Sequence, residues 1–289
     1  MIFSYKKINA KVNLTLDVLG RKDGFHTIES FVSSITICDR VLVTKRKDHA
    51  INFKQFGIRA CKDQLQNNAY LAAKAFMETY GTTGVNLYLH KKIPVGGGLG
   101  GSSADIAAVL VAMKNLYKVD ADLTVLAQKL GSDVVFMLNG GNAVMRGRGE
   151  DVVKINISRS LPLILIKNNR DISSKNCYKK FDELNEKHTP CTKIAVENLA
   201  EGRFYDFCKV AKNDLENAAN QFIPELDNAK NYLIQSGAYA AMLTGSGSVV
   251  YGIFDDKSAR KKAYESLKKV YNKERIILAE TIKDKKLKY

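Results

Sequence analysis

The stretch that decides the fold is PVGGGLGGSSADIAAVLVAM, residues 94–113, in which a glycine cluster leads directly into a helical pattern. Before it, VNLYLHKKI (85–93) alternates apolar and polar residues, which predicts a strand that ends at the glycines. After it, a helix is expected to run to about Tyr117, with Ser102 or Ser103 as its N-cap. The pattern therefore predicts a strand, a glycine-rich turn and a helix in direct succession.

This turn has the chemistry of an anion site. Glycines from Gly96 to Gly101 let a ligand approach the backbone and can point several N–H groups in one direction. The helix that follows adds a partial positive charge and free N–H donors, and Ser102 and Ser103 add hydroxyls. The turn is neither a Walker A loop nor a dinucleotide fingerprint. On its own, it fits a structural corner nearly as well as a phosphate site.

The rest of the chain mixes strands and helices without strict alternation, which predicts an α+β fold. A strand is expected over 8–18, a second strand region after the 20–26 turn, and a hairpin over 41–54. Helices are expected over 67–81 and 122–131, begun by Asn67 and Asp122 and ended by Gly81 and Gly131. Residues 161–167 (LPLILIK) read as a buried strand that opens a second domain, so the chain is divided into 1–158 and 159–289. Two short strands around a small-residue turn are expected within 237–254, followed by a basic helix and a strand over 274–280.

Three further features carry possible chemistry. Lys11 and Asn13 lie two residues apart in a predicted strand, so their side chains share one side, although a single lysine in a strand is usually at an exposed edge. Asp133 lies between a helix end and an apolar run, where it fits either a reactive carboxylate or an N-cap. The turn at Gly245, Ser246 and Gly247 offers more backbone N–H groups, although many hairpins look like this.

Composition excludes several classes of function. The 289-residue chain has a net charge of +15, but the excess is shared almost equally between 1–150 and 151–289. The lysine-rich segment near the C-terminus reads as the solvated face of an amphipathic helix with Ala259, Ala263, Leu267, Val270 and Tyr271 buried. Five scattered cysteines and four separated histidines give neither a disulfide framework nor a metal site. Because there is no signal-like or membrane-spanning run, we expect a cytoplasmic protein with no nucleic-acid or membrane partner.

Taken together, these segments resemble the GHMP kinase superfamily over almost the whole chain. The resemblance rests on AKVNLTLDVLGRKDGFHTIESF, PVGGGLGGSSADIAAVL, GSDVVFMLNGGNAVMRGRGE, NDLENAA and MLTGSGSVVYGIF, which follow the family in order and spacing. It implies two domains, the N-terminal one like the second domain of ribosomal protein S5 and the C-terminal one ferredoxin-like, with the active site in the cleft between them. The DGFH segment (23–26) is similar to the branch that uses ATP to phosphorylate the 2-hydroxyl of a cytidine diphosphate sugar alcohol in non-mevalonate isoprenoid biosynthesis.

The resemblance also assigns roles to residues. Asp133 matches the carboxylate that accepts the hydroxyl proton, and Lys11 its cationic partner. The positions matching the ATP site are Pro94, Val95, Gly96, Gly97, Gly98, Leu99, Gly100, Gly101, Ser102, Ser103, Ala104, Asn67 and Asn68, with Gly245, Ser246 and Gly247 as a second turn on the phosphate side. The positions matching the cytidine substrate are Asn13, Phe25, His26 and Tyr178, the two aromatic rings of Phe25 and Tyr178 being expected to sandwich the base.

The sequence departs from the family at several of these positions. Phe25 stands where Tyr is common, Tyr178 where Phe is often found, Asn9 where Pro is usual, and Ser102 where Gly is frequent. ATP use implies Mg²⁺, for which the sequence shows no carboxylate cage. A monomer or weak homodimer is expected. Two alternatives remain open: a GHMP kinase that acts on a different alcohol, and a catalytically inactive nucleotide-binding relative.

Overall fold

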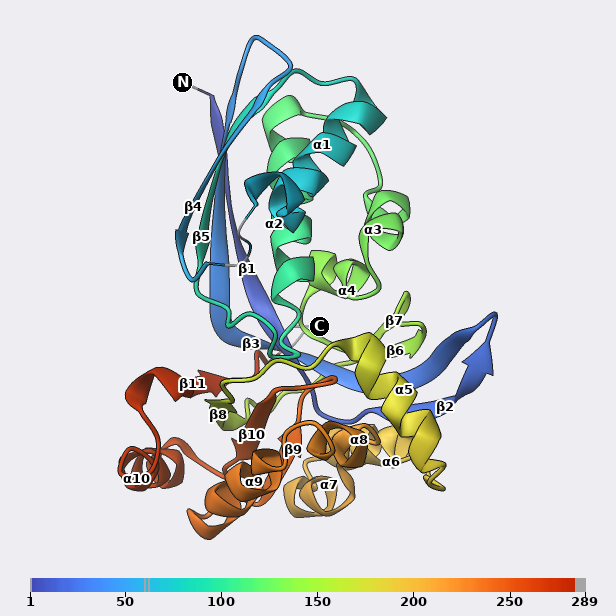
Figure 1. Ribbon diagram of the computed structural model, residues 1–289, viewed down its shortest axis with the longest axis vertical. Helices are drawn as coiled ribbons and strands as arrows, with labels where there is room; N and C mark the ends of the chain where they lie inside the picture. The colour runs from blue at the N-terminus through green and yellow to red at the C-terminus, as the bar shows by residue number, and fades with distance from the viewer. Residues whose placement is uncertain (1, 60, 62, 284–289) are drawn as a thin grey trace. The chain divides into compact units, whose positions relative to one another are not determined.

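The structure, a computed structural model, describes residues 2–59, 61 and 63–283 (Figure 1). The chain forms two compact units that alternate along the sequence. The first unit takes the described residues of 1–10, 37–95 and 100–140, and the second unit takes those of 11–36, 96–99 and 141–289. The strands β1 (Phe3–Asn13) and β3 (Phe25–Lys45) each contribute residues to both units. The domain division at residue 158 stays a prediction.

In the first unit, the strand that precedes the glycines lies inside a sheet. β5 (Val85–Lys91) pairs antiparallel with Arg40–Lys45 of β3 on one side and parallel with β4 (Ile51–Gly57) on the other. The strand predicted over 85–93 is therefore confirmed, but the hairpin predicted over 41–54 is wrong. The two segments follow each other in sequence, yet β5 separates them in the sheet and pairs with both.

Helices cover this sheet and complete the core of the first unit (Figure 1). They are α1 (Asn68–Tyr80), α2 (Gly101–Tyr117), α3 (Thr124–Leu130) and α4 (Val134–Asn139), with a 3₁₀ turn η1 (Gln64–Gln66) before α1. The predicted ends of α1 are confirmed, because the Asn67 side chain accepts from the N–H of Ala69 and Gly81 adopts a left-handed φ of 61°. The start of α3 predicted at Asp122 is one residue early, because its N-cap is Leu123, although the Asp122 carboxylate accepts from the N–H of Thr124.

The start of α2 differs from the prediction. Its N-cap is Gly100, whose φ of 69° is left-handed, and no side chain caps the helix. Ser102 and Ser103 were expected at this position but lie inside the first turn. The correction follows from backbone geometry, since only glycine adopts a left-handed φ without strain at the point where the turn becomes a helix. The hydroxyls of the first turn are therefore not used as caps.

The second unit contains a four-stranded antiparallel sheet in the order β11-β8-β10-β9. Its strands are β8 (Pro162–Lys167), β9 (Ala240–Leu243), β10 (Val249–Ile253) and β11 (Ile276–Glu280). The order of helices and strands along this part of the chain is the βαββαβ connectivity of the ferredoxin-like fold. The buried strand at 161–167, the pair of strands within 237–254 and the final strand are all confirmed.

The second unit also contains further strands and helices. The strands are β2 (Asp17–Lys22), the first part of β3, β6 (Asn142–Gly147) and β7 (Asp151–Lys154). The helices are α5 (Ser174–Leu184), α6 (Thr192–Ala200), α7 (Phe204–Val210), α8 (Glu216–Asn220), α9 (Glu225–Gln235) and α10 (Lys257–Leu267), with the 3₁₀ turn η2 (Lys273–Arg275). In α10, Ala263 and Leu267 are buried as predicted, whereas Val270 is exposed because the helix ends before it. The mixture of sheets and helices confirms the α+β class.

Within the described part of the chain, no helix has the length and apolar character needed to cross a bilayer.

Candidate functional site

Lys11 and Asn13 form a buried pair in the second unit. The side chain of each is only 5% exposed, and the Lys11 ammonium donates to Asn13 Oδ1 at 2.6 Å. The two-residue period of a strand places them on one side, as predicted. The alternative of an exposed edge lysine is wrong. A buried ammonium needs compensating partners, so this cation is held at a defined place in the fold.

The first half of the glycine turn packs onto the second small-residue turn, all within the second unit. The N–H of Ser248 donates to Gly96 O at 3.1 Å, and the N–H of Val249 donates to Gly97 O at 3.3 Å. The Thr244 hydroxyl donates to Gly98 O at 3.2 Å. These contacts leave no room for side chains, because a Cβ on Gly98 would overlap the carbonyl oxygen of Thr244.

Asn13 connects the two turns to Lys11. Its N–H donates to the Thr244 hydroxyl at 3.1 Å, and its side-chain amide donates to the Ser30 hydroxyl at 2.8 Å. The N–H of Lys11 donates to Leu99 O at 3.0 Å. The second unit therefore brings together the predicted residues Lys11, Asn13, Gly96, Gly97, Gly98, Leu99, Gly245, Ser246 and Gly247.

The remainder of the glycine turn belongs to the first unit. Gly101, Ser102 and Ser103 form the first turn of α2, and their N–H groups donate no hydrogen bond to any described residue. Pro94 and Ala104 are buried on either side, whereas Ser102 is exposed. Free N–H groups at the positive end of a 17-residue helix suit an anion.

Asp133 occupies the N-cap position of α4 but does not act as a cap. Its φ of −79° and ψ of −9° are helical, and its side chain makes no capping hydrogen bond to α4. The carboxylate is half-buried. The N-cap alternative therefore explains the position of Asp133 in the chain but not what its carboxylate does. Asp133 lies in the first unit and Lys11 in the second.

Lys91, Asp39 and Asp105 form a buried charge network in the first unit, next to the first turn of α2. The Lys91 ammonium contacts Asp39 at 2.8 Å and Asp105 at 2.6 Å, and all three side chains are at most 3% exposed. Asp39 also accepts from the N–H of Ile93 at 2.8 Å. Sequence reasoning missed this network, although a lysine at the end of an apolar strand and an aspartate inside an apolar helix were visible in the pattern.

The network contains two carboxylates and one ammonium, so its charges do not balance when both acids are ionised. Burial raises the pKa of Asp105 to about 8, although the Lys91 ammonium opposes this shift. For Lys91, burial lowers the pKa, but the carboxylates of Asp105 and Asp39 outweigh it and the pKa is raised. A proton on Asp105 would leave one carboxylate opposite one ammonium, so burial and charge balance both favour the protonated acid.

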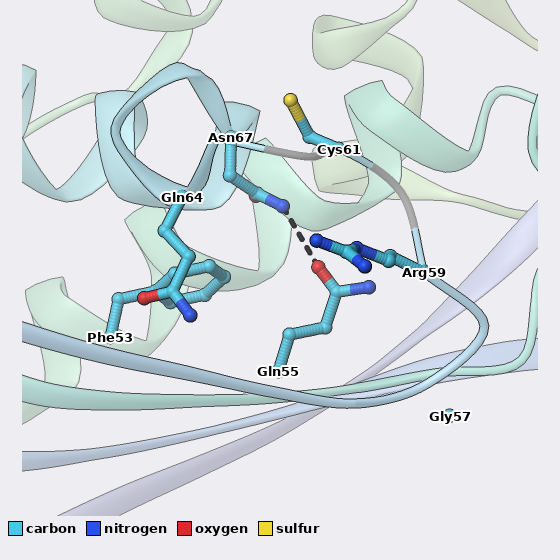
Figure 2. Close-up of a pocket in the computed structure, with 7 residues that line it drawn as sticks. All are labelled: Phe53, Gln55, Gly57, Arg59, Cys61, Gln64 and Asn67. Atoms are coloured by element: carbon cyan, nitrogen blue, oxygen red, sulfur yellow. Dashed lines mark hydrogen bonds between the residues drawn. The ribbon is translucent and has the colours of Figure 1, made fainter.

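A pocket of about 330 Å³ opens in the first unit beside the start of α1 (Figure 2). Its lining is mainly amide and aromatic, with one guanidinium and one thiol, and consists of Phe53, Gln55, Gly57, Arg59, Cys61, Gln64 and Asn67. The Asn67 side-chain amide donates to Gln55 Oε1 at 2.9 Å, which orients both amides. Asn68 is exposed, begins α1 and is not among the lining residues.

The residues predicted to bind a cytidine substrate lie in the second unit. The rings of His26 and Tyr178 stack, with centroids 4.6 Å apart and planes inclined by 24°. His26 Nε2 lies 2.8 Å from Asp182 Oδ1, and Asp182 also pairs with Arg21. Phe25 is half exposed, and the Arg148 guanidinium lies 3.8 Å from the centre of its ring. Asp182 and Arg148 were not predicted. Each lies more than 100 positions along the chain from the residue that it contacts, His26 or Phe25.

Comparison with known families defines the class of protein. A family model described as "GHMP kinases N terminal domain" matches residues 67–144, and one described as "GHMP kinases C terminal" matches residues 195–273. The crystal structure of a homoserine kinase from Cytophaga hutchinsonii superposes with a TM-score of 0.73 at 19% identity, covering 98% of this chain and 95% of that one. The fold is therefore that of a GHMP kinase.

More similar relatives narrow the class. A 4-diphosphocytidyl-2-C-methyl-D-erythritol kinase of Thermoanaerobacter pseudethanolicus is 37% identical over 272 residues, which are 92% of each chain. One from Clostridium tetani is 34% identical and covers 96% of this chain and 99% of its own. A crystal structure of 4-(cytidine 5'-diphospho)-2C-methyl-D-erythritol kinase superposes with a TM-score of 0.82 at 29% identity, covering 96% and 98%. The chain belongs to the 4-diphosphocytidyl-2-C-methyl-D-erythritol kinase family of GHMP kinases.

Proposed function

We propose that this protein transfers the γ-phosphoryl group of ATP to the 2-hydroxyl of 4-diphosphocytidyl-2-C-methyl-D-erythritol. The observation that carries the proposal is the cluster of Lys11 and Asn13 against the two small-residue turns, in a chain 37% identical to a kinase of that name. A buried cation beside two turns made of small residues suits the transfer of a charged phosphoryl group.

In the proposed reaction, the 2-hydroxyl oxygen attacks the γ-phosphorus, the bond to the β–γ bridging oxygen breaks, and ADP leaves. Asp133 accepts the proton of the hydroxyl. Lys11 neutralises charge that develops on the transferring group, and its contact with Asn13 keeps the ammonium in place. Phosphoryl transfer depends mainly on such positioning and charge neutralisation.

The ATP molecule is proposed to bind with its phosphates at the glycine turn and its base in the pocket of Figure 2. The amides of Gln55, Gln64 and Asn67 each offer a donor and an acceptor, which match the mixed donor and acceptor edge of adenine. The ring of Phe53 supplies an apolar face for it. The Mg²⁺ that accompanies ATP is proposed to be held mainly by the phosphates of ATP.

The cytidine end of the substrate is proposed to bind at Phe25, His26 and Tyr178. A base can replace either ring contact seen in the structure, the His26 ring on Tyr178 or the Arg148 guanidinium on Phe25. In the family, Tyr is common at position 25 and Phe at position 178, the reverse of this chain. Because stacking needs only the ring face, both rings are still proposed to stack on the base. The fixed donors and acceptors of His26 and Asn13 would then select the substrate.

An assay of ATP consumption with 4-diphosphocytidyl-2-C-methyl-D-erythritol, with phosphorus NMR of the product, tests the proposal. A new phosphomonoester on carbon 2 is expected. Turnover with homoserine or mevalonate instead would show a kinase for another alcohol. ATP binding without turnover on any of these alcohols would show an inactive relative.

The base pocket can be tested with Asn67→Ala. Asn67 both lines the pocket and caps α1, and loss of a cap costs about 1 kcal/mol of stability. Asp256→Ala is the matched control, because Asp256 caps α10 through the N–H of Ala259 at 2.8 Å. Both variants are expected to lose similar stability, and only Asn67→Ala is expected to raise KM for ATP, by about tenfold. Equal KM values in the two variants would contradict the assignment.

We also propose that the protein works in the cytoplasm on these small molecules, without a nucleic-acid or membrane partner. The even distribution of its positive charge and its five free cysteines support this.

A further inference from the structure

A carboxylate lies directly on the glycine turn of the second unit. Gly96 adopts a left-handed φ of 65°, and a Cβ placed on it would overlap the carboxylate of Asp171. Gly96 itself is exposed, and the Asp171 side chain is 57% exposed. The Asp171 carboxylate therefore occupies the space that a side chain at position 96 would fill. The proposed function places the phosphates of ATP, which are also anionic, at the same turn.

The same carboxylate is held by a lysine of the neighbouring sheet. Lys167 ends β8, opposite Val249 of β10, and its ammonium lies 2.5 Å from Asp171 Oδ1. The ammonium also donates to the Ser248 hydroxyl at 2.8 Å and to Asn168 O at 2.9 Å. Ser248 in turn donates its N–H to Gly96 O.

Lys167 is thereby fixed beside both small-residue turns. Its side chain is 18% exposed, so the ammonium is largely withdrawn from solvent but remains accessible to a ligand. Three acceptors satisfy its three protons, and two of them, Ser248 and Asn168, are buried residues of the framework. Asp171 is the exposed member and therefore the one that can be exchanged.

We infer that Lys167 is an ATP-phosphate ligand and that Asp171 holds its place in the ligand-free protein. This inference rests on the proposed function. When ATP binds, a phosphate oxygen replaces the Asp171 carboxylate on the Lys167 ammonium, and the carboxylate turns away into solvent. Ser248 and Asn168 keep the ammonium in position throughout the exchange, so only one of its three contacts changes.

Electrostatic repulsion between Asp171 and the phosphates of ATP favours this exchange. If Asp171 stayed on the turn, its negative charge would lie close to the phosphates and oppose their binding. With the carboxylate displaced, Lys167 gains a charge-assisted hydrogen bond to an acceptor of higher charge. Asp171 therefore lowers the affinity for ATP, and Lys167 raises it.

The test is titration calorimetry of ATP with MgCl₂, and separately of adenosine, into the intact protein and three variants. Lys167→Met is expected to weaken ATP binding about tenfold or more, because one charge-assisted contact is lost. Asp171→Asn is expected to strengthen it about threefold to tenfold. In Lys167→Met/Asp171→Asn, the gain from Asp171→Asn is expected to shrink, since the two side chains act as a pair. Adenosine, which has no phosphate, should bind all four proteins equally.

Lys74→Met and Glu78→Gln are the matched controls, because this ion pair has the same i,i+4 spacing and the same charges on the surface of α1. Neither should change ATP affinity. The same ATP affinity in wild type, Lys167→Met and Asp171→Asn would overturn the assignment of Lys167. Weaker ATP binding in Asp171→Asn would also overturn it, and would instead make the carboxylate a ligand of the Mg²⁺ that accompanies ATP. If the expected shifts occur but wild type phosphorylates no 4-diphosphocytidyl-2-C-methyl-D-erythritol, the proposed function fails while Lys167 remains a phosphate ligand.

Discussion

At the scale of single residues, Asp133 shows that a residue at an N-cap position need not use its side chain as a cap. It sits where a cap would sit, yet its side chain does not cap α4. Asp122, eleven positions earlier, precedes Leu123, the N-cap of α3, and its carboxylate accepts from the N–H of Thr124 at 2.9 Å. The two aspartates lie at helix starts in the same unit, but only the Asp122 carboxylate accepts a hydrogen bond from the first turn of its own helix.

This contrast gives a matched pair of variants. Asp133→Asn is expected to fold normally and to lower kcat by about 10²- to 10⁴-fold, because the proposed base for the hydroxyl proton is removed. Asp122→Asn should leave kcat unchanged. Lys11→Met is expected to lower kcat by about 10²-fold or more, and to destabilise the fold by about 1–3 kcal/mol because Asn13 Oδ1 loses the ammonium donor and keeps only the Thr244 hydroxyl at 3.4 Å. Steady-state kinetics and chemical unfolding measure both effects. Near-wild-type kcat in Asp133→Asn or Lys11→Met would refute that residue's role.

Asp105 gives a prediction about pH. Its pKa is raised from 3.8 to about 8 by burial in the folded protein, so the folded state binds a proton that the unfolded state has released. Stability from this group is present below about pH 4 and is lost progressively as pH rises to about 8. Urea unfolding of wild type between about pH 6 and pH 9 should show this loss, whereas Asp105→Asn, which stays neutral, should show less of it. An equal slope in both proteins would contradict the assignment.

At the scale of elements, the glycine turn is defined by what lies against it. Gly98 adopts a φ of 74° and faces the carbonyl of Thr244, so it meets two requirements, backbone conformation and space. Gly202, at the end of α6, has a similar φ of 79° with nothing within 4 Å of a Cβ. Gly98 is required both by its left-handed φ and by the neighbouring turn, whereas Gly202 is required only by its left-handed φ.

Substituting each glycine by alanine separates the two requirements. Both Gly98→Ala and Gly202→Ala carry the left-handed strain, which costs about 1–3 kcal/mol. Only Gly98→Ala must also push the two small-residue turns apart. It is therefore expected to raise KM for ATP by at least tenfold and to lose more stability than Gly202→Ala. Thermal unfolding and ATP kinetics on the two variants provide the comparison, and the same KM in both would mean that the packing of the turns does not matter for ATP.

At the scale of the whole molecule, the net charge of +15 is shared almost equally between residues 1–150 and 151–289. An even positive field still attracts small anions over a distance that salt shortens. We therefore expect the charge to affect the rate at which anionic ligands arrive, and not the fold or the chemical step.

Ionic strength should accordingly affect association alone. Raising the salt concentration from about 50 mM to about 300 mM is expected to lower kcat/KM for ATP several-fold while kcat stays constant. RNA binding measured over the same range serves as the control and should stay weak. Tight RNA binding that falls steeply with salt, without ATP consumption, would instead support a nucleic-acid-binding protein.

The sequence by itself determined the local structure and the types of residue at the site. The two-residue period put Lys11 and Asn13 on one side of a strand, and the change of period predicted a helix after the glycines, although its N-cap is Gly100. These features depend on neighbours within a few residues, so they can be predicted without knowledge of the fold. The matching motifs then indicated the family.

Only the tertiary structure decided which distant segments meet. It inserted β5 between β3 and β4, placed Thr244 against Gly98, buried Lys91 between Asp39 and Asp105, and laid Asp171 on Gly96. Each of these pairings joins positions far apart in sequence or on different elements, and its free energy comes from burial and hydrogen bonds that exist only after folding. No local pattern contains that information, and for this reason the glycine turn could be found in the sequence but its neighbours could not.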